Sequence, residues 1–492
     1  SGAVASGEYG YITPEYVLEQ AGFSVNPSRD SYAGYTDAAI YIVSRVGGEG
    51  SDATLDDPES TRYMQLTDEE KADLSSLKAA GFEKVILLLN TSNALNMDFA
   101  DQQEYGIDAI LWMGVTGCNG LEALGDLLNG NVSPSGRLVD TYLYDNMSNP
   151  AMQNFGDMKY EGTEIPYINY VEGIYLGYKY FETRYEDTVM GTPNVGNYVY
   201  DDVVYRPFGF GLSYTDFDWS GYTLTDNGDG SLTASVTVTN SGTTAGKDVV
   251  EIYYQSPYTD YDKQNLVEKA SVNLAGFAKT ETLEPGASET VTVTFDAQDT
   301  MKSYDGNAAR TYIMDEGDYY VTAARDAHNA VENILAAKNY TADGDAHLVG
   351  TYNVPAFLTL NTDSATGAEV SNLFDDAVAL DTQYLSRQNW SRVEEGLTYT
   401  APATNIENLT ANWAASGRPT TVDNTAEFTT EADNGLTFAD MTGVPYNDPK
   451  WNTLLDQLTI TEMHDLFKRA GYTTSAMPSI SKERTYDFDG PA

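Results

Sequence analysis

The run Ala38-Ala39-Ile40-Tyr41-Ile42-Val43 decides the fold of the first part of this chain. It is apolar or aromatic throughout, and similar runs follow at residues 85–89 (Val-Ile-Leu-Leu-Leu) and 109–112 (Ala-Ile-Leu-Trp). Strands without polar alternation are buried on both faces, which is typical of parallel sheets covered by helices on either side. We therefore predict an α/β sandwich domain with a mostly parallel sheet over residues 1–215.

Helix signals separate these runs. Thr67 is an N-cap candidate, Glu70 three residues later completes a capping box, and Gly81 ends the helix that they start. Further helices are predicted over residues 13–22 and 121–130, each ending at a glycine. The alternation of strand and helix supports the parallel arrangement of the sheet.

A strict two-residue period begins after residue 215. Apolar Leu232, Ala234, Val236 and Val238 alternate with threonine and serine, and an Asn-Gly-Asp-Gly turn at residues 227–230 precedes them. Short strands of the same kind are predicted at residues 249–254, 291–295 and 319–323. Several short strands without helical windows predict a fibronectin type III-like β-sandwich over residues 216–327.

The remaining chain divides into a weakly patterned part and an ordered part. Residues 328–447 are rich in Thr, Asn, Ala and Asp, and we predict a linker that wraps over its neighbours. Residues 448–492 contain a helix with Thr459 as N-cap and Glu462 as its capping-box partner, followed by an apolar stripe. We predict that this part is the beginning of another domain.

Composition excludes several classes of function. The chain has 492 residues with 27 basic and 74 acidic side chains, giving a formal charge of −47. Such a field repels phosphate backbones and anionic lipids, which argues against nucleic-acid or membrane-surface binding. A single cysteine, Cys118, excludes an intrachain disulfide and a zinc site made of several thiolates. The apolar runs are shorter than the roughly 20 residues that span a bilayer.

Candidate chemistry centres on the glycine-rich segment Gly47-Gly48-Glu49-Gly50, which follows the first strand. A dinucleotide-binding loop would have to open a helix at once, but acidic residues and a proline follow instead. A general acid is the second interpretation, because a carboxyl at the carboxyl edge of a parallel sheet lies where ligands bind, and neighbouring acids favour its protonated form. A solvated acidic loop is the third. The histidines His328, His347 and His464 lack metal-ligand spacing.

Several ordered strings resemble glycoside hydrolase family 3 in its β-glucosidase branch. The loop at residues 44–52 is similar to S-R-x-x-G-E-G-x-D-R, and residues 63–67 are similar to the stretch that follows it. Residues 131–138 (Asn-Val-Ser-Pro-Ser-Gly-Arg-Leu) are close to N-x-N-P-S-G-K-L. Residues 172–181 resemble E-G-I-Y-V-G-Y-R-Y-F, and residues 207–214 resemble P-F-G-Y-G-L-S-Y.

The resemblance implies a permuted domain order. In most members a (β/α)8 barrel comes first, whereas the opening of such a barrel is found here at residues 454–492, after the sandwich. Residues 448–492 would then be the first βα portion of the barrel, completed by another segment. A second chain, a further segment or loss of the rest of the barrel are the alternatives.

Residue roles follow from the resemblance. Glu49 would be the general acid/base, and Asp489 in the string Asp-Gly-Pro-Ala would bind sugar hydroxyls, with Arg45 and Asp52 as further substrate-binding residues. The nucleophilic aspartate of the family has no match in this chain. Phe217-Asp218-Trp219 is similar to its motif only superficially and belongs to the start of the sandwich.

Two departures from the family pattern concern this site. Ala53 replaces the arginine that follows the aspartate in the family loop, which removes a nearby cation. The stretch at residues 116–120 also differs from the usual P-G-Q-E-G, and its Cys118 is expected to be a buried thiol.

The resemblance implies a retaining, exo-acting β-glucosidase that uses neither a metal nor an organic cofactor. A β-xylosidase and a non-catalytic, glycan-binding surface protein remain the alternatives. Expected partners are a β-glucoside or oligosaccharide substrate, the segment or chain that carries the rest of the barrel, and a possible homodimer, without nucleic acid or membrane insertion. Acidity and the near absence of cysteine favour an extracellular or surface location in a bacterium. These 492 residues alone are expected to be inactive.

Overall fold

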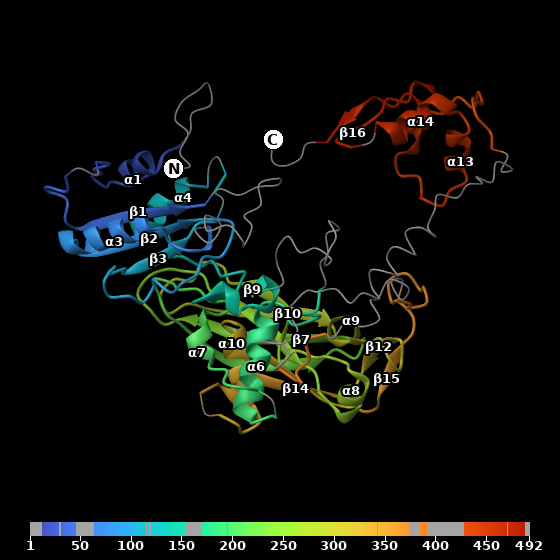
Figure 1. The fold of residues 1–492 in the computed structure, drawn as a ribbon. Helices are drawn as coiled ribbons and strands as arrows, with labels where there is room; N and C mark the ends of the chain where they lie inside the picture. The colour runs from blue at the N-terminus through green and yellow to red at the C-terminus, as the bar shows by residue number, and fades with distance from the viewer. Residues whose placement is uncertain are drawn as a thin grey trace, which may run out of the picture. The chain divides into compact units, whose positions relative to one another are not determined.

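The computed structural model describes residues 12–28, 31–45, 63–114, 116–117, 120–153, 170–193, 195–341, 343–372, 384–390, 428–469 and 471–487. The chain forms two compact units, residues 1–406 and 407–492 (Figure 1). Among the described residues, no helix has both the length and the apolar composition needed to cross a bilayer.

The first unit begins with the predicted parallel sheet. Its strands are β1 (Ala38–Ser44), β2 (Lys84–Asn90) and β3 (Ala109–Trp112), and they lie in the order β1-β2-β3 with parallel pairing throughout. Residue 38 pairs with residue 84, and residue 86 with residue 109, so the three strands end at a common carboxyl edge. The predicted strands and their direction are confirmed.

Helices cover both faces of this sheet. Helices α1 (Pro14–Gln20) and α4 (Glu122–Leu128) lie on one face, where Val17 and Leu124 pack with Leu88 (Figure 1). Helix α3 (Asp68–Ala80) packs Leu74 against Leu87 on the other face. Its predicted capping box is present, and Gly81 ends it at a φ of 82°, which favours glycine. The α/β layers are therefore confirmed.

Short elements connect this sheet with the sandwich. The elements are β4 (Tyr142–Leu143), η1 (Asn146–Ser148), α5 (Pro150–Gln153), α6 (Tyr178–Met190), α7 (Tyr200–Val203) and β5 (Val204–Arg206). Strands β4 and β5 pair in antiparallel fashion.

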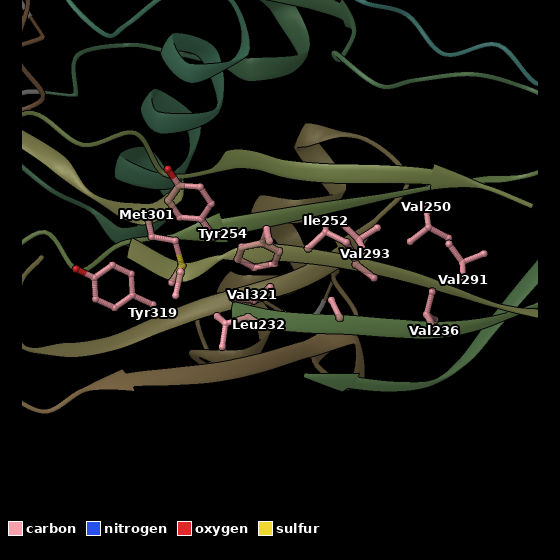
Figure 2. Packing of buried hydrophobic residues seen from close by; sticks show 14 of the residues in the cluster. Leu232, Val236, Val250, Ile252, Tyr254, Val291, Val293, Met301, Tyr319 and Val321 are labelled. Carbon is pink, nitrogen blue, oxygen red and sulfur yellow. The ribbon is translucent and has the colours of Figure 1, made fainter. Parts of the chain in front are cut away.

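Two antiparallel sheets form the sandwich. One has the order β10-β7-β6 and the other β14-β13-β8-β9, with a small third sheet β11-β12-β15 beside them. The alternating residues of β7 point inward as predicted, and Figure 2 shows Leu232 and Val236 packed with Ile252 and Val321. The bounds are β6 (Phe217–Asp226), β7 (Ser231–Asn240), β8 (Val249–Gln255), β9 (Asn273–Lys279), β10 (Ser288–Asp296), β11 (Ser303–Asp305), β12 (Thr311–Met314), β13 (Gly317–Ala324), β14 (Val349–Val354) and β15 (Leu358–Leu360). Two short helices, α8 (Asp260–Asn265) and α9 (Ala297–Met301), lie between the strands.

The predicted end of the sandwich at residue 327 is wrong, and so is the start of the linker at residue 328. Helix α10 (Ala327–Ala337), η2 (Ala346–Leu348) and the strands β14 and β15 follow, and both strands pair with sandwich strands. The helix buries a stripe of small and branched side chains at helical spacing, which the polar composition of residues 328–447 conceals. The residues of the stripe are Ala327, Ala330, Val331, Ile334 and Leu335.

Strand β8 is buried along its whole length because both of its faces are covered. Val250 and Ile252 point into the sandwich core, whereas Tyr253 packs on α10 from the opposite face. Helices α6 and α10 lie side by side over this outer face (Figure 1). The sandwich and the preceding domain therefore share a packed interface.

Part of the predicted wrap-around segment is anchored on this interface. Residues 384–390 lie against α6, and the Trp390 side chain is buried, with its Nε1 donating to Asp187 Oδ2 at 2.8 Å. Arg387 is buried as well and forms ion pairs with Glu186 and Asp187. Residues 373–383 and 391–427 lie outside the described residues.

The second unit is small. Its elements are η4 (Phe438–Met441), α13 (Lys450–Leu455), α14 (Ile460–Lys468), β16 (Thr473–Thr474), η5 (Pro478–Ile480) and β17 (Thr485–Tyr486). The predicted capping box of Thr459 and Glu462 is present. The apolar stripe of α14 is largely open, with Ile460 55% and Phe467 82% exposed. The assignment of residues 448–492 to a barrel stays a prediction.

Candidate functional site

The candidate site loop begins at the carboxyl edge of the parallel sheet. Strand β1 ends at Ser44, and Arg45 follows directly. Glu49 and Asp52 lie outside the described residues, as does Asp489 near the other end of the chain. The predicted roles of these three carboxyls therefore stay predictions, and the described geometry concerns the residues at both ends of the loop.

Arg45 is held by protein groups on three sides. Its Nη1 donates to Glu70 Oε1 and its Nη2 to Glu70 Oε2, both at 2.8 Å. Nη1 also donates to the Ser44 carbonyl at 2.9 Å, and Nη2 donates to the Gln65 carbonyl at 2.6 Å. The Arg45 side chain is 8% exposed. It thus connects the end of β1 with the chain that follows the candidate loop.

Glu70 makes two structural interactions at the start of α3. Besides binding Arg45, its Oε2 accepts the backbone N–H of Thr67 at 2.8 Å, which completes the capping box. Burial alone would raise the pKa of Glu70, but the hydrogen bonds from Arg45 and Thr67 and the charge of Arg45 lower it overall. Sequence reasoning identified Glu70 as a capping residue and missed its pairing with Arg45.

Neighbouring strands contribute polar groups to the same edge. Asn90 at the end of β2 donates from Nδ2 to Ser44 Oγ at 3.3 Å, and its carbonyl accepts the backbone N–H of Arg45. Trp112 at the end of β3 donates its indole N–H to the Thr91 carbonyl at 3.0 Å. Hydrogen bonds between the strand ends therefore link the three strands at this edge.

Two of the family-like strings join the α/β domain to the sandwich. The string at residues 131–138 pairs with the one at 207–214, since Leu138 N–H donates to the Phe210 carbonyl at 2.9 Å. Arg137 Nη2 then donates to the buried Asp248 Oδ1 at 2.6 Å. The indole N–H of Trp219 binds the other oxygen of Asp248 at 2.7 Å. Trp219 lies within β6, as expected for a residue of the sandwich.

The third string, residues 172–181, has a similar interface role. Gly177 has a φ of 52° and immediately precedes α6. The buried Tyr175 donates its hydroxyl to Glu268 Oε2 at 2.6 Å, and Glu268 Oε1 in turn accepts from Ser386. These residues hold the anchored segment and the sandwich against the first domain.

One of the three histidines has a defined partner at this interface. His328 on α10 contacts the buried Glu182 of α6, with 2.8 Å between Nδ1 and Oε2, and it stacks on Tyr200. Burial would lower the pKa of His328, but the charges of Glu182 and its neighbours raise it overall. His328 therefore pairs and packs within this interface.

Comparisons with known proteins agree with the two domains of the first unit. Residues 17–178 match the glycosyl hydrolase family 3 C-terminal domain, and residues 248–327 match the fibronectin type III-like domain. The chain is 33% identical over 303 residues to a β-glucosidase of Ruminococcus albus, covering 60% of this chain and 28% of that protein. It is 31% identical over 333 residues to β-glucosidase A of Butyrivibrio fibrisolvens, covering 60% of this chain and 37% of that protein.

A solved structure shows the same similarity. The β-glucosidase of Paenibacillus barengoltzii superposes with a TM-score of 0.51 at 28% identity, covering 71% of this chain and 32% of that one. The chain thus spans about a third of the length of the relatives that it matches. With residues 17–178 and 248–327 matched in sequence and a β-glucosidase structure matched in fold, the chain carries a glycosyl hydrolase family 3 C-terminal domain and a fibronectin type III-like domain.

Proposed function

We propose that this chain is part of a retaining, exo-acting β-glucosidase that releases terminal, non-reducing β-D-glucosyl residues. The observation that carries the proposal is the similarity to β-glucosidases, which reaches 33% identity over 303 residues. Because the chain spans about a third of such a relative's length, we assign the activity to the complete enzyme. In that enzyme, the domains described here would supply one side of the active site.

Glu49 is the proposed general acid/base. Its support is the family-like loop sequence and the end of β1 at Ser44, which starts that loop at the carboxyl edge of the parallel sheet. Ligands of open α/β sheets bind at this edge. We assign Asp489 to the sugar hydroxyls, because a carboxylate that accepts two hydroxyl hydrogen bonds orients a pyranose. Asp52 stays a proposed substrate ligand.

The nucleophile is proposed to be an aspartate on a further barrel segment, with residues 448–492 as the opening of that barrel. The aspartate attacks the anomeric carbon and forms a glycosyl-enzyme ester while Glu49 donates its proton to the leaving glycosidic oxygen. Glu49 then removes a proton from water, whose oxygen attacks the anomeric carbon and releases the sugar. Retention requires the two carboxyl groups to lie about 5–5.5 Å apart.

Substitution of the proposed acid tests this function. In the complete enzyme, Glu49→Gln removes proton donation, which contributes about 10²–10⁴-fold to such reactions. We expect kcat/KM to fall by about 10³-fold on an alkyl glucoside, whose leaving group needs a proton. The loss should be much smaller on 2,4-dinitrophenyl glucoside, whose leaving group departs as a stable anion. Equal losses on both substrates would overturn the assignment.

A matched control comes from the same acidic stretch. Glu59→Gln removes one carboxyl from residues 46–62 without touching the proposed acid, and we expect both activities to stay within about twofold of the wild type. Assays of nitrophenyl β-xyloside beside the β-glucoside separate β-xylosidase activity. A complete protein that binds glucans without hydrolysing either substrate would favour the non-catalytic alternative.

A further inference from the structure

Three buried ionisable side chains meet in the sandwich domain. Asp262 lies on α8, Lys269 lies between α8 and β9, and Asp315 lies between β12 and β13. The Lys269 ammonium donates to Asp262 Oδ2 at 2.9 Å and contacts Asp315 Oδ2. It also donates to the Pro257 carbonyl at 3.0 Å. The side chains of Lys269, Asp262 and Asp315 are 3%, 0% and 3% exposed, so a primary amine and two carboxyls are enclosed together.

Asp262 is the carboxyl of this cluster that is suited to carry a proton. With both carboxyls ionised, the three groups would hold one uncompensated negative charge, which is costly in a protein interior. Asp262 Oδ2 accepts the Thr259 backbone N–H at 2.7 Å, whereas its Oδ1 is buried and has no hydrogen-bond partner among the described residues. Burial and the charge of Asp315 raise the pKa of Asp262, although Lys269 and Thr259 oppose the shift.

An amine and a carboxyl in contact are the reactants of an amide bond. Holding two reactants in place gives effective concentrations of about 10⁵–10⁸ M. In water, hydration of the ammonium and the carboxylate opposes their condensation. Burial removes that hydration and favours the neutral amine and the neutral acid, which are the forms that react. The buried contact of Lys269 with Asp315 therefore meets the conditions for condensation.

We propose that Lys269 and Asp315 form an isopeptide bond and that Asp262 is the general acid and base of the reaction. The ammonium passes one proton to the Asp315 carboxylate, and the nitrogen lone pair then attacks Asp315 Cγ. Asp262 donates its proton to the departing hydroxyl, which leaves as water while the carbonyl forms again. Asp262 then takes the extra proton from the nitrogen. One ammonium and one carboxylate thus become one amide and one water, and Asp262 is regenerated.

The bond joins two connections of the sandwich that lie 46 positions apart in the sequence. One connection leads from α8 into β9, and the other leads from β12 into β13. A covalent link between them restricts the unfolded chain and so favours the folded state. All three reacting groups belong to the sandwich domain, so the bond does not depend on the proposed function.

The mass of the wild-type chain tests the proposal. The denatured chain should weigh less than its sequence by the mass of one water molecule. Trypsin should leave the chain uncut after Lys269, whose amine has become an amide, and should release residues 264–279 joined to residues 311–325. Fragmentation of this branched peptide should place the link at Lys269 and Asp315. A full mass, or a loss of water at another position such as a succinimide at an Asp-Gly pair, would overturn the proposal.

Variants test the role of each group. Lys269→Arg keeps a cation but has no primary amine, so this variant should have the full mass of its sequence. Asp262→Asn keeps the shape of the side chain and loses the proton transfer, which should slow bond formation by about 10²-fold. Mass spectra taken at intervals after cell-free synthesis measure this rate. Bond formation at the wild-type rate in Asp262→Asn would overturn the role of Asp262, and the wild-type mass decides the bond itself even if a variant fails to fold.

The matched control is a lysine–aspartate pair at the surface of α8. Lys263 lies 3.2 Å from Asp260, and their side chains are 46% and 89% exposed. Because water keeps both groups charged, trypsin should cut after Lys263, and Lys263→Arg should leave the loss of one water unchanged. A link at Lys263 would show that contact alone is sufficient and would overturn the role of the buried site.

Discussion

The sandwich of the first unit and the small second unit follow the same rules of amphipathic patterning with opposite results. In the sandwich, inward residues of two sheets close a continuous core that includes Leu232, Val236 and Ile252 (Figure 2). In the second unit, every side chain of α14 is at least partly exposed, and Phe467 is 82% exposed. An apolar stripe becomes a core only where a second layer covers it. The second unit therefore leaves Ile460 and Phe467 of this stripe outside its own small cluster.

The two units also differ in their use of charge. The interface beside the sandwich buries ion pairs, among them Arg387 between Glu186 and Asp187. Pairs of the second unit, such as Arg469 with Asp465, lie at the surface. Buried pairs are costly when one partner is lost, whereas surface pairs contribute little. Substitutions in both units can test this contrast.

The largest effect is expected at Arg387. Arg387→Met leaves the buried carboxylate of Asp187 without its counter-charge and leaves Glu186 with Lys338 alone, and loss of a buried partner typically costs about 3–5 kcal/mol. Trp390 packs at the same place, so urea unfolding followed by tryptophan fluorescence should report the loss. The free energy of unfolding of Arg387→Lys, which keeps the charge without the fork, should lie between those of the wild type and Arg387→Met. A loss below about 1 kcal/mol in Arg387→Met would show that the segment 384–390 contributes little to the unit.

Core truncations compare the two units directly. Ile252→Ala opens a cavity between two sheets and should lower the free energy of unfolding by about 3 kcal/mol. Leu454→Ala, in the small cluster of the second unit, should lower it by about 1–2 kcal/mol because that cluster can collapse around the cavity. Hydrogen exchange resolved by peptide separates the two units. Thr292→Ala, on the exposed face of β10, is the control and should stay within about 0.5 kcal/mol. Equal costs at Ile252 and Leu454 would remove the distinction between the cores.

A pH dependence should distinguish the sandwich interface. Glu251 on β8 is buried, and burial together with the charge of Asp326 raises its pKa to about 7, although the hydroxyl of Tyr253 and the charge of Arg137 oppose the shift. The folded protein therefore keeps a proton that the unfolded chain releases near pH 4.5. Stability contributed by this proton is lost as pH rises from about 4.5 to 7.

Glu251→Gln should remove this dependence. The variant keeps a neutral side chain of the same size, so we expect it to be more stable than the wild type by about 2 kcal/mol at pH 8 and nearly equal at pH 4.5. Urea unfolding at both pH values measures the difference. The stability that His328 contributes depends on pH in the same direction. Pairing with Glu182 raises the pKa of His328, so the contribution of its protonated form is also lost as the pH rises. A variant that is less stable at pH 8 would contradict the raised pKa of Glu251.

The smallest effect is expected at Phe467. Phe467→Ser removes an 82% exposed ring from α14 and should change the stability of the second unit by less than about 0.5 kcal/mol. Hydrogen exchange resolved by peptide measures the difference. A loss of 2 kcal/mol or more would show that the ring is covered.

Local signals predicted those parts of the fold in which a few neighbouring residues decide the outcome. The capping box of Thr67 and Glu70 and the alternation from Leu232 to Val238 are both complete within a short window. Helix α10 was missed because its stripe is rich in alanine, which carries little hydrophobic signal. The anchor at Arg387 could not be predicted, since its partners lie 200 residues away in the sequence.

At the candidate site, too, some features follow from the local sequence and others depend on residues that the fold brings together. The sequence by itself determined the strand that ends at Ser44 and the similarity of this region to the family 3 C-terminal domain, because strand burial is encoded by adjacent residues. Only the tertiary structure decided what Arg45 binds. Its fork is filled by the adjacent Ser44 carbonyl and by Gln65 and Glu70, which the packing of α3 on the sheet brings to it, and no residue pattern specifies which acceptors will surround a buried cation.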